Sequence, residues 1–231
     1  MRKSHRIKAV IFDLWKTLIS SFVSEKSDEI IKMLNLSGRK EFWNGVGTVS
    51  IRPIEKMDEV IMGFCKAVKR ENKFNLIKKI LKDLESKTIV FDDVIPTLSF
   101  LKEKKLKLGL ITNTDKPAFL IAAKRLNFEK FFDVITTSFE TGLLKPNPKI
   151  FYLTVKKLGL RFGECMMVGD NPEDDISTPQ KLGMVTVLVN RKNQYIEKPQ
   201  NVDYLIKSLS ELPILTAQKE KIPWLEKEIR L

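Results

Sequence analysis

Short apolar runs rich in β-branched residues alternate with stretches in which apolar residues recur at helical spacing. This alternation is typical of a parallel sheet covered by helices on both faces, so we predict an α/β fold with a doubly wound parallel sheet. Helices are expected at residues 117–126, 149–158 and 174–182. The predicted strands are residues 7–12, 106–111, 132–136, 166–168 and 185–189, with a possible sixth at 204–206.

The first two predicted strands are separated by about 90 residues, whereas a crossover needs only a dozen or so. Segments 55–70 and 74–84 within this gap each place their apolar residues on one helical face. We therefore predict an inserted helical cap at residues 20–92. The core would comprise residues 1–19 and 93–231, ending in one or two amphipathic helices at 217–231.

Lys and Arg exceed Asp and Glu by 41 to 29, which gives a net charge of +12 and favours anionic partners. The lysines are spread over several helical segments instead of forming a stripe with aromatic residues, so a small anionic substrate is preferred over nucleic acid as the partner. No apolar run approaches the roughly 20 residues that a membrane helix needs. We expect a soluble, cytoplasmic protein without membrane contact, and an oligomer is possible but not evident.

The chain has a single histidine, His5, which lies in a charged N-terminal stretch. This placement excludes Ser-His-Asp and Cys-His catalysis and a histidine-based zinc site. Cys65 and Cys165 are far apart in apolar surroundings, where packing is the expected role. The side chains that could carry out catalysis are thereby narrowed to carboxylates, lysine and hydroxyls.

Polar residues follow the predicted strands at the points where the strands end. Asp13 follows the first strand, Thr112 and Asn113 the second, and Asp170 the fourth, while Lys145 lies in the loop after the third. Ligands of doubly wound sheets bind beyond the carboxyl ends of the strands. These residues are therefore candidates for one common site.

The segments VIFDLWKTL, LITNT, LLKPNP and VGDNPEDD occur in this order along the chain. They resemble the four motifs of the haloacid dehalogenase superfamily, over residues 1–19 and 93 to about 190. The resemblance implies a Rossmann-like core with strand order 3-2-1-4-5 and, in one large branch, a helical cap inserted after the first strand. The insertion predicted at residues 20–92 has that position.

The resemblance also implies the roles of the motif residues. Asp13 would attack the substrate as a covalent nucleophile, which splits one difficult displacement into two easier ones. Thr112 and Asn113 would bind the transferred group, since hydrogen-bond donors stabilise charge on phosphoryl oxygens. Lys145 would steady the negative charge around the nucleophile. The implied reaction is hydrolysis of a small phosphorylated molecule.

Clustered carboxylates raise one another's pKa unless a cation lies among them. The spacing of Asp170 and Asp175 fits the metal-binding motif of the family, and Mg²⁺ prefers such oxygen ligands. We expect Asp13, the backbone carbonyl of Trp15, and Asp170 as direct ligands, with Asp175 bound directly or through water. Asp174 is expected to cap the following helix.

Two residues depart from the family pattern. Trp15 stands where most phosphatases of the family have an aspartate that protonates the leaving group, and Lys16 replaces the glycine usually found next. General acid-base catalysis is typically worth about a hundred- to ten-thousandfold. Turnover would therefore be slow, or the substrate would carry a good leaving group, or another residue would transfer the proton.

An aromatic residue at position 15 resembles the 2-haloacid dehalogenase branch, in which halide leaves without protonation. That branch works without metal, whereas Asp170 and Asp175 would repel a haloacid carboxylate, so a phosphate substrate is preferred. A catalytically weak protein that binds a phosphorylated ligand is the third hypothesis.

Overall fold

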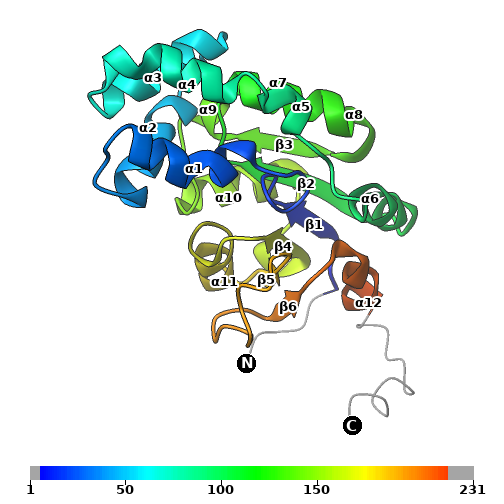
Figure 1. Cartoon of the computed structure of the whole chain (residues 1–231). Coiled ribbons are helices and arrows are strands. Elements are labelled where there is room, and N and C mark those ends of the chain that lie inside the picture. Colours follow the sequence, from blue (N-terminus) through cyan, green and yellow to red (C-terminus); the bar gives the residue numbers. More distant parts are fainter. Residues whose placement is uncertain (1–5, 218–231) are drawn as a thin grey trace.

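The structure is a computed structural model that describes residues 6–217. It is built around a six-stranded sheet in which every neighbouring pair is parallel (Figure 1). The order is β3-β2-β1-β4-β5-β6, which confirms the α/β prediction and adds β6 to the expected five-strand order. The strands are β1 (Ala9–Phe12), β2 (Lys107–Thr112), β3 (Val134–Thr137), β4 (Cys165–Gly169), β5 (Val185–Val189) and β6 (Tyr204–Ile206).

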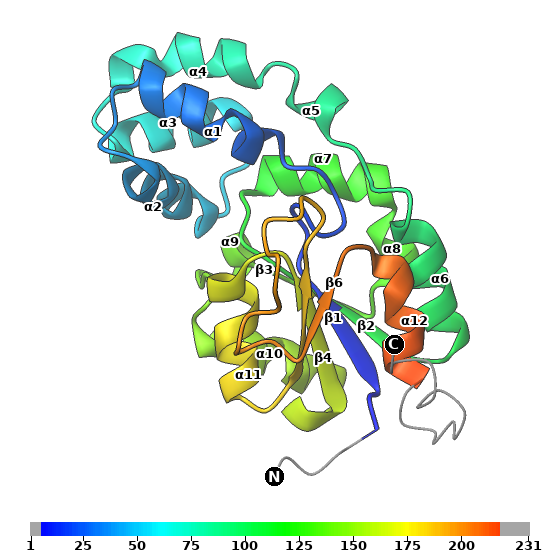
Figure 2. The same cartoon turned by 60° about the horizontal axis from the view of Figure 1, so that its bottom comes forward.

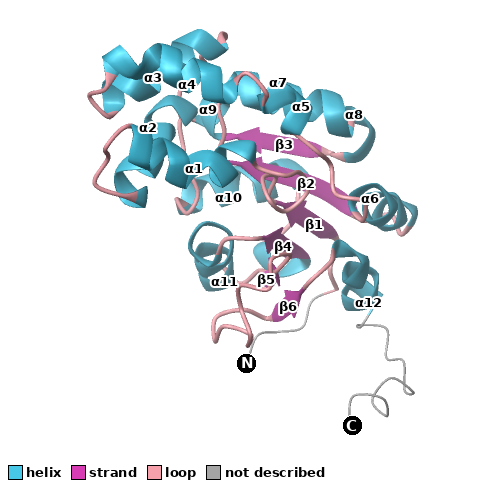
Figure 3. Cartoon of the chain, in the orientation of Figure 1, coloured by secondary structure: helices cyan, strands magenta, loops and turns pink. Residues whose placement is uncertain are grey.

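Helices cover both faces of this sheet (Figure 3). Side chains alternate along β1: Val10 and Phe12 join one apolar cluster, and Ala9 and Ile11 join another on the opposite face. All of these side chains are fully buried, which explains why the central strand is a continuous apolar run. The flanking elements are α6 (Val94–Glu103), α7 (Lys116–Leu126), α8 (Phe128–Phe131), α9 (Ser138–Thr141), α10 (Pro148–Leu158), η2 (Phe162–Glu164), η3 (Pro172–Ser177), α11 (Thr178–Lys181), η4 (Leu209–Glu211) and α12 (Leu212–Ala217).

The chain between β1 and α6 is helical. Figure 2 shows these helices grouped together beyond one end of the sheet. They have an apolar cluster of their own, in which Cys65 is fully buried. The elements are α1 (Phe22–Met33), α2 (Arg39–Ser50), α3 (Met57–Ala67), η1 (Glu71–Lys73), α4 (Phe74–Leu81) and α5 (Leu84–Lys87). We call α1–α5 the helical insertion.

The two connections between the insertion and the sheet lie side by side and run antiparallel, with an isolated bridge between Ile19 and Val90. The amide of Ser20 donates to the carbonyl of Ile89 at 2.8 Å, and the amide of Phe91 donates to Leu18 at 3.1 Å. The pairing brings the entry and exit of the insertion together, near the ends of the predicted range 20–92. The division into two domains stays a prediction.

Several expectations differ from the structure in detail. The predicted helix at 174–182 begins earlier, as the π-helical turn η3, and becomes α-helical only in α11. The C-terminal helices predicted beyond residue 217 lie outside the described residues.

Cys165, like Cys65, is a free and buried thiol, which confirms the packing role. Within residues 6–217, none of the helices is long and apolar enough to cross a membrane.

Candidate active site

Asp13 begins the loop that follows the central strand β1. Its backbone amide donates to the carbonyl of Val168 on β4 at 2.9 Å, which continues the sheet pairing to the first residue of the loop. The side chain is nearly buried, with 6% of the residue exposed. Its Oδ1 accepts a hydrogen bond from Lys145 Nζ at 2.5 Å, and its Oδ2 accepts one from Thr17 Oγ1 at 3.0 Å. Both carboxylate oxygens are thereby oriented.

Lys145 lies between α9 and α10 and is only 4% exposed. Its Nζ donates to Asp13 Oδ1 and to Asp175 Oδ1, the latter at 2.6 Å. Burial lowers the pKa of Lys145, but the charges of Asp13 and Asp175 outweigh burial and raise the pKa above its usual value. Lys145 is therefore a permanent positive charge between two carboxylates.

Asn113 fixes the backbone of Lys145. Its Oδ1 accepts from the Lys145 amide at 2.8 Å, and its Nδ2 donates to the Lys145 carbonyl at 3.0 Å. This pair of bonds ties the end of β2 to the loop that carries the lysine. Both polar groups of the Asn113 amide are thus engaged, and its predicted contact with substrate stays a prediction.

Thr112, the last residue of β2, is fully buried. Its hydroxyl is the one buried side-chain polar atom among the described residues that has no hydrogen-bond partner. An unsatisfied buried hydroxyl typically costs about 1–3 kcal/mol. An acceptor atom on a ligand, such as a phosphoryl oxygen, would satisfy this hydroxyl.

The loop after β4 positions Asp170, Asp174 and Asp175. Asn171 caps η3, with its side chain accepting hydrogen bonds from the amides of Glu173 and Asp174. The Asn171 amide donates to Asp175 Oδ2 at 3.1 Å, while the Asp175 amide donates back to the Asn171 carbonyl at 2.9 Å. Asp175 is therefore held rigidly, with one oxygen on the loop and the other on Lys145.

Asp13, Asp170 and Asp175 come together at the carboxyl ends of β1 and β4. Each offers a carboxylate oxygen, and these oxygens all lie within 4.8 Å of one another. Burial raises the pKa of Asp175 to about 8, opposed by Lys145 and reinforced by Asp13 and Asp170. Burial and the charge of Asp13 also raise the pKa of Asp170. Crowded carboxylates of this kind fit a divalent cation with oxygen ligands.

Burial raises the pKa of Asp174 as well, to about 6. Its Oδ2 accepts a hydrogen bond from Asn171 Nδ2 at 3.2 Å. The expectation that Asp174 caps the following helix was wrong, because Asn171 is the N-cap and the Asp174 amide is one of the groups that it caps. Asp174 is not part of the carboxylate cluster formed by Asp13, Asp170 and Asp175.

Gly169 leaves room for the side chain of Asp175, because glycine has no Cβ atom. A Cβ atom at position 169 would lie 2.4 Å from the side chain of Asp175, far inside van der Waals contact. We expect Gly169→Ala to displace Asp175 and to lower the free energy of unfolding by about 1–3 kcal/mol, as overpacking does. Urea denaturation measures this loss. The matched control is Gly109→Ala on β2, where the added atom would meet Ile11 Cγ1 at the longer distance of 3.1 Å. An equal or larger loss in the control would contradict the argument.

The loop from Asp13 to Ile19 carries the two departures from the family pattern. Trp15 is partly buried and packs against the apolar cluster on the β1 face that also contains Phe12, so the indole has a packing role. Lys16 has a φ of 63°, and its Nζ donates a hydrogen bond to Asp170 Oδ2. The predicted contact of the Trp15 carbonyl with a metal stays a prediction.

Arg191, just after the carboxyl end of β5, supports this loop. Its guanidinium donates to the Thr17 carbonyl at 2.8 and 3.1 Å, pairs with Asp93 at 2.8 Å and stacks on Phe91. Burial raises the pKa of Asp93, but hydrogen bonds from Arg191 and Ser208 outweigh burial and hold the pKa below its usual range. Neither Thr17 nor Arg191 was predicted as a site residue. The hydroxyl four residues after Asp13 was an available signal, whereas nothing in the sequence links position 191 to position 17.

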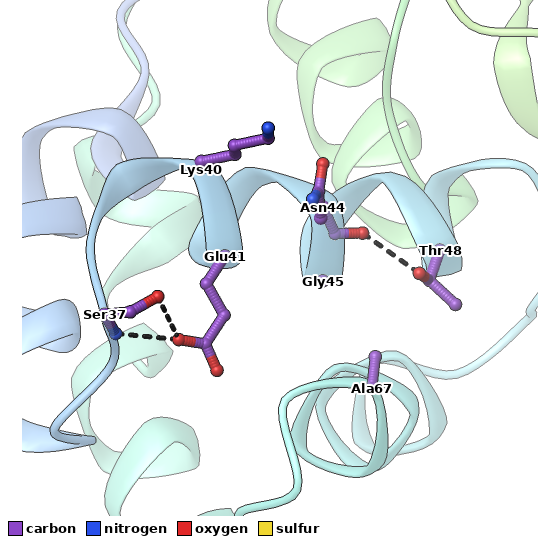
Figure 4. Close-up of a pocket in the computed structure, with 7 residues that line it drawn as sticks. All are labelled: Ser37, Lys40, Glu41, Asn44, Gly45, Thr48 and Ala67. Atoms are coloured by element: carbon purple, nitrogen blue, oxygen red, sulfur yellow. Dashed lines mark hydrogen bonds between the residues drawn. The ribbon is translucent and has the colours of Figure 1, made fainter.

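A separate hollow lies in the helical insertion (Figure 4), with a volume of about 380 Å³. The Glu41 carboxylate in it accepts hydrogen bonds from the Ser37 amide and hydroxyl at 2.7 and 2.9 Å. Ser37 and Glu41 therefore pair with each other, and the hollow contains none of the carboxylate cluster. The lining residues are Ser37, Lys40, Glu41, Asn44, Gly45, Thr48 and Ala67.

The chain is similar to known proteins over both its motifs and its fold. It is 38% identical over 113 residues to glyceraldehyde 3-phosphate phosphatase of Methanopyrus kandleri, covering 49% of this chain and 48% of the relative. The crystal structure of a HAD phosphatase from Thermococcus onnurineus is 28% identical, with a TM-score of 0.65 over 91% of this chain and 98% of that one. The 2-haloacid dehalogenase of Pseudomonas syringae pv. Tomato DC3000 shares the fold, at 22% identity and a TM-score of 0.62 over 92% and 99% of the two chains.

The similarity to the first curated relatives covers about half of their length. The model of the haloacid dehalogenase-like hydrolases matches a larger part, residues 7–183, which include Asp13, Thr112, Lys145 and the acidic loop after β4. The chain therefore belongs to the haloacid dehalogenase-like hydrolase family.

Proposed function

We propose that this protein is a Mg²⁺-dependent phosphatase that hydrolyses a small phosphorylated molecule through an aspartyl-phosphate on Asp13. The observation that carries the proposal is the buried Asp13 carboxylate, fixed by Lys145 at 2.5 Å and by Thr17 at 3.0 Å. The phosphatase relatives support the same reaction class.

In the first step a carboxylate oxygen of Asp13 attacks phosphorus, and the bond from phosphorus to the leaving oxygen breaks. In the second step water attacks the phosphorus of the aspartyl-phosphate, which frees Asp13 and releases inorganic phosphate. Two steps with one buried nucleophile replace a single displacement by water. Lys145 places a positive charge 2.5 Å from Asp13 Oδ1 and so holds that oxygen in position.

Thr112 would donate a hydrogen bond to an oxygen of the transferred phosphoryl group. Its unpartnered hydroxyl supports this role, since the ligand would then satisfy it. Asn113 would act through Lys145, whose backbone it clamps, and its own contact with substrate is a further part of the proposal.

Asp13, Asp170, Asp175 and the Trp15 carbonyl would hold the Mg²⁺ ion. The mutual approach of the carboxylate oxygens to within 4.8 Å supports this ligand set. A bound Mg²⁺ ion neutralises charge on the phosphoryl oxygens and on the nucleophile.

The helical insertion would act as a cap over this end of the sheet. Ser138 Oγ on α9 donates to the Ser50 carbonyl at 2.7 Å, and Lys116 pairs with Glu55 at 2.5 Å. Such polar contacts join the insertion to the sheet near Thr114, on the same side as the motif residues. A small anionic substrate between cap and core, in a cytoplasmic protein, is the setting we infer.

Trp15 restricts the leaving group. The indole has no proton to give at neutral pH, so a leaving oxygen that is stable as an anion is favoured. Acyl phosphates and aryl phosphates carry such leaving groups.

Dehalogenation of a 2-haloacid is the alternative, and Trp15 is the observation that favours it. Asp170 and Asp175 argue against it, because a haloacid carboxylate would enter a site that already contains crowded negative charge.

The proposal is tested with purified protein on acetyl phosphate and p-nitrophenyl phosphate, in Mg²⁺ and in EDTA. We expect phosphate release in Mg²⁺ and a loss of about a hundredfold or more in EDTA, since removing one stabilising charge typically costs that much. Halide release from 2-chloropropionate is measured in parallel. Metal-independent halide release without phosphate release would contradict the phosphatase proposal and favour the dehalogenase alternative.

A further inference from the structure

Lys16 lies three residues after the nucleophile, in a backbone conformation that favours glycine. Its φ of 63° is in the left-handed region, which is strained for a residue with a Cβ atom. Strain of this kind persists where the surrounding structure holds the residue in place, and it clusters at functional sites. The presence of lysine instead of glycine at this position therefore needs a structural explanation.

The side chain provides that reason. Lys16 Nζ forms an ion pair with Asp170 Oδ2, although the two residues are 154 positions apart in the sequence. The lysine side chain is 39% exposed and the aspartate side chain 15%, so the ion pair lies at the open edge of the carboxylate cluster. Burial lowers the pKa of Lys16, but Asp170 outweighs burial and raises it, so the ammonium is charged.

The charges of the cluster show what this ammonium does. In the fully ionised form that binds a metal ion, Asp13, Asp170 and Asp175 contribute three negative charges. Lys145 neutralises one by pairing with Asp13 and Asp175, which leaves two, a match for one divalent cation. Lys16 neutralises a further charge at Asp170, which is a proposed metal ligand. Its ammonium and a metal ion therefore compete for the same carboxylate.

We propose that Lys16 is a tethered cation that occupies Asp170 in the metal-free protein and competes with Mg²⁺ for it. This inference rests on the metal site of the proposed function. Lys16 weakens metal binding, because its ion pair with Asp170 must break first. It also stabilises the metal-free protein, because without it Asp170 would face Asp13 and Asp175 with less compensation.

Two variants test the competition: Lys16→Gly removes the ammonium and relieves the backbone, and Lys16→Met removes the ammonium but keeps a long side chain. The control is Lys105→Gly, because Lys105 is exposed at the end of α6 with a φ of 61° and has the same backbone conformation away from the cluster. The control thereby separates the effect of relieving the backbone strain from the effect of removing the ammonium beside Asp170.

Isothermal titration calorimetry with MgCl₂ measures the dissociation constant. We expect it to fall roughly tenfold in both Lys16 variants, within the about 5- to 150-fold range of coupling between sites, and to stay unchanged in Lys105→Gly. Thermal unfolding in EDTA gives the second readout: Lys16→Met should melt below the wild type, and the stabilisation gained on adding Mg²⁺ should be larger than in the wild type.

Equal or weaker Mg²⁺ binding in both Lys16 variants would overturn the inference. If the wild type still released phosphate in a Mg²⁺-dependent way, the proposed function would stand and only the competition would be lost. Absence of Mg²⁺ binding in the wild type and in both variants would overturn the competition and the metal site together.

Discussion

Replacing Asp13 with asparagine is expected to lower phosphate release by about 10⁴-fold or more, the scale seen when a covalent nucleophile is removed. The amide has nearly the same shape and keeps an oxygen for the bond from Thr17 or Lys145. It has no anionic oxygen to attack phosphorus. The loss should therefore appear in kcat, while the folded structure is retained.

Steady-state kinetics with acetyl phosphate in Mg²⁺ measure this effect, and circular dichroism verifies the fold. The matched control is Asp92→Asn, which makes the same chemical change at an exposed position in the connection leading to α6. The control should keep wild-type activity. Wild-type activity in Asp13→Asn would refute the nucleophile.

Replacing Lys145 with methionine is expected to affect both activity and stability. The ammonium bonds Asp13 and Asp175 at 2.5 and 2.6 Å with almost no solvent access. Without it two buried carboxylates face each other uncompensated, and breaking a buried pair of this kind costs about 3–5 kcal/mol. Activity should fall about a hundred- to a thousandfold, as when one preorganised charge donor is lost.

The stability loss is measured by urea denaturation in EDTA, so that no added metal compensates for the missing ammonium. Lys149→Met is the control, because Lys149 is exposed on the first turn of α10 and its replacement removes the same charge nearby. It should leave both quantities unchanged. A Lys145→Met variant as stable and as active as Lys149→Met would show that Lys145 contributes to neither stability nor catalysis.

The sheet and the gathering of motif residues could be predicted because each rests on a local pattern. Buried strands are continuous apolar runs, and Asp13, Thr112 and Asp170 stand directly at the ends of such runs. Once the strands are parallel, their carboxyl ends meet at one edge, which brings these residues together without knowledge of any side-chain contact. The length of the gap after β1 likewise indicated the helical insertion.

The contacts made within the site could not be predicted, because they join residues far apart in sequence through side-chain geometry. The clamp from Asn113 to Lys145, the ion pair from Lys16 to Asp170 and the support of Thr17 by Arg191 are of this kind. Helix patterning also failed at η3, where the cap at Asn171 and the tie between Asp175 and the loop impose a wider turn than the apolar spacing indicates.

Trapping the covalent intermediate tests the account most directly. Wild-type protein and Asp13→Asn are mixed with acetyl phosphate and Mg²⁺, quenched in acid within the first turnover, digested and analysed by mass spectrometry. The account predicts a phosphoryl group on the peptide that contains Asp13 in the wild type and none in the variant. A phosphoryl group on another residue, or undiminished phosphate release by the variant, would contradict it.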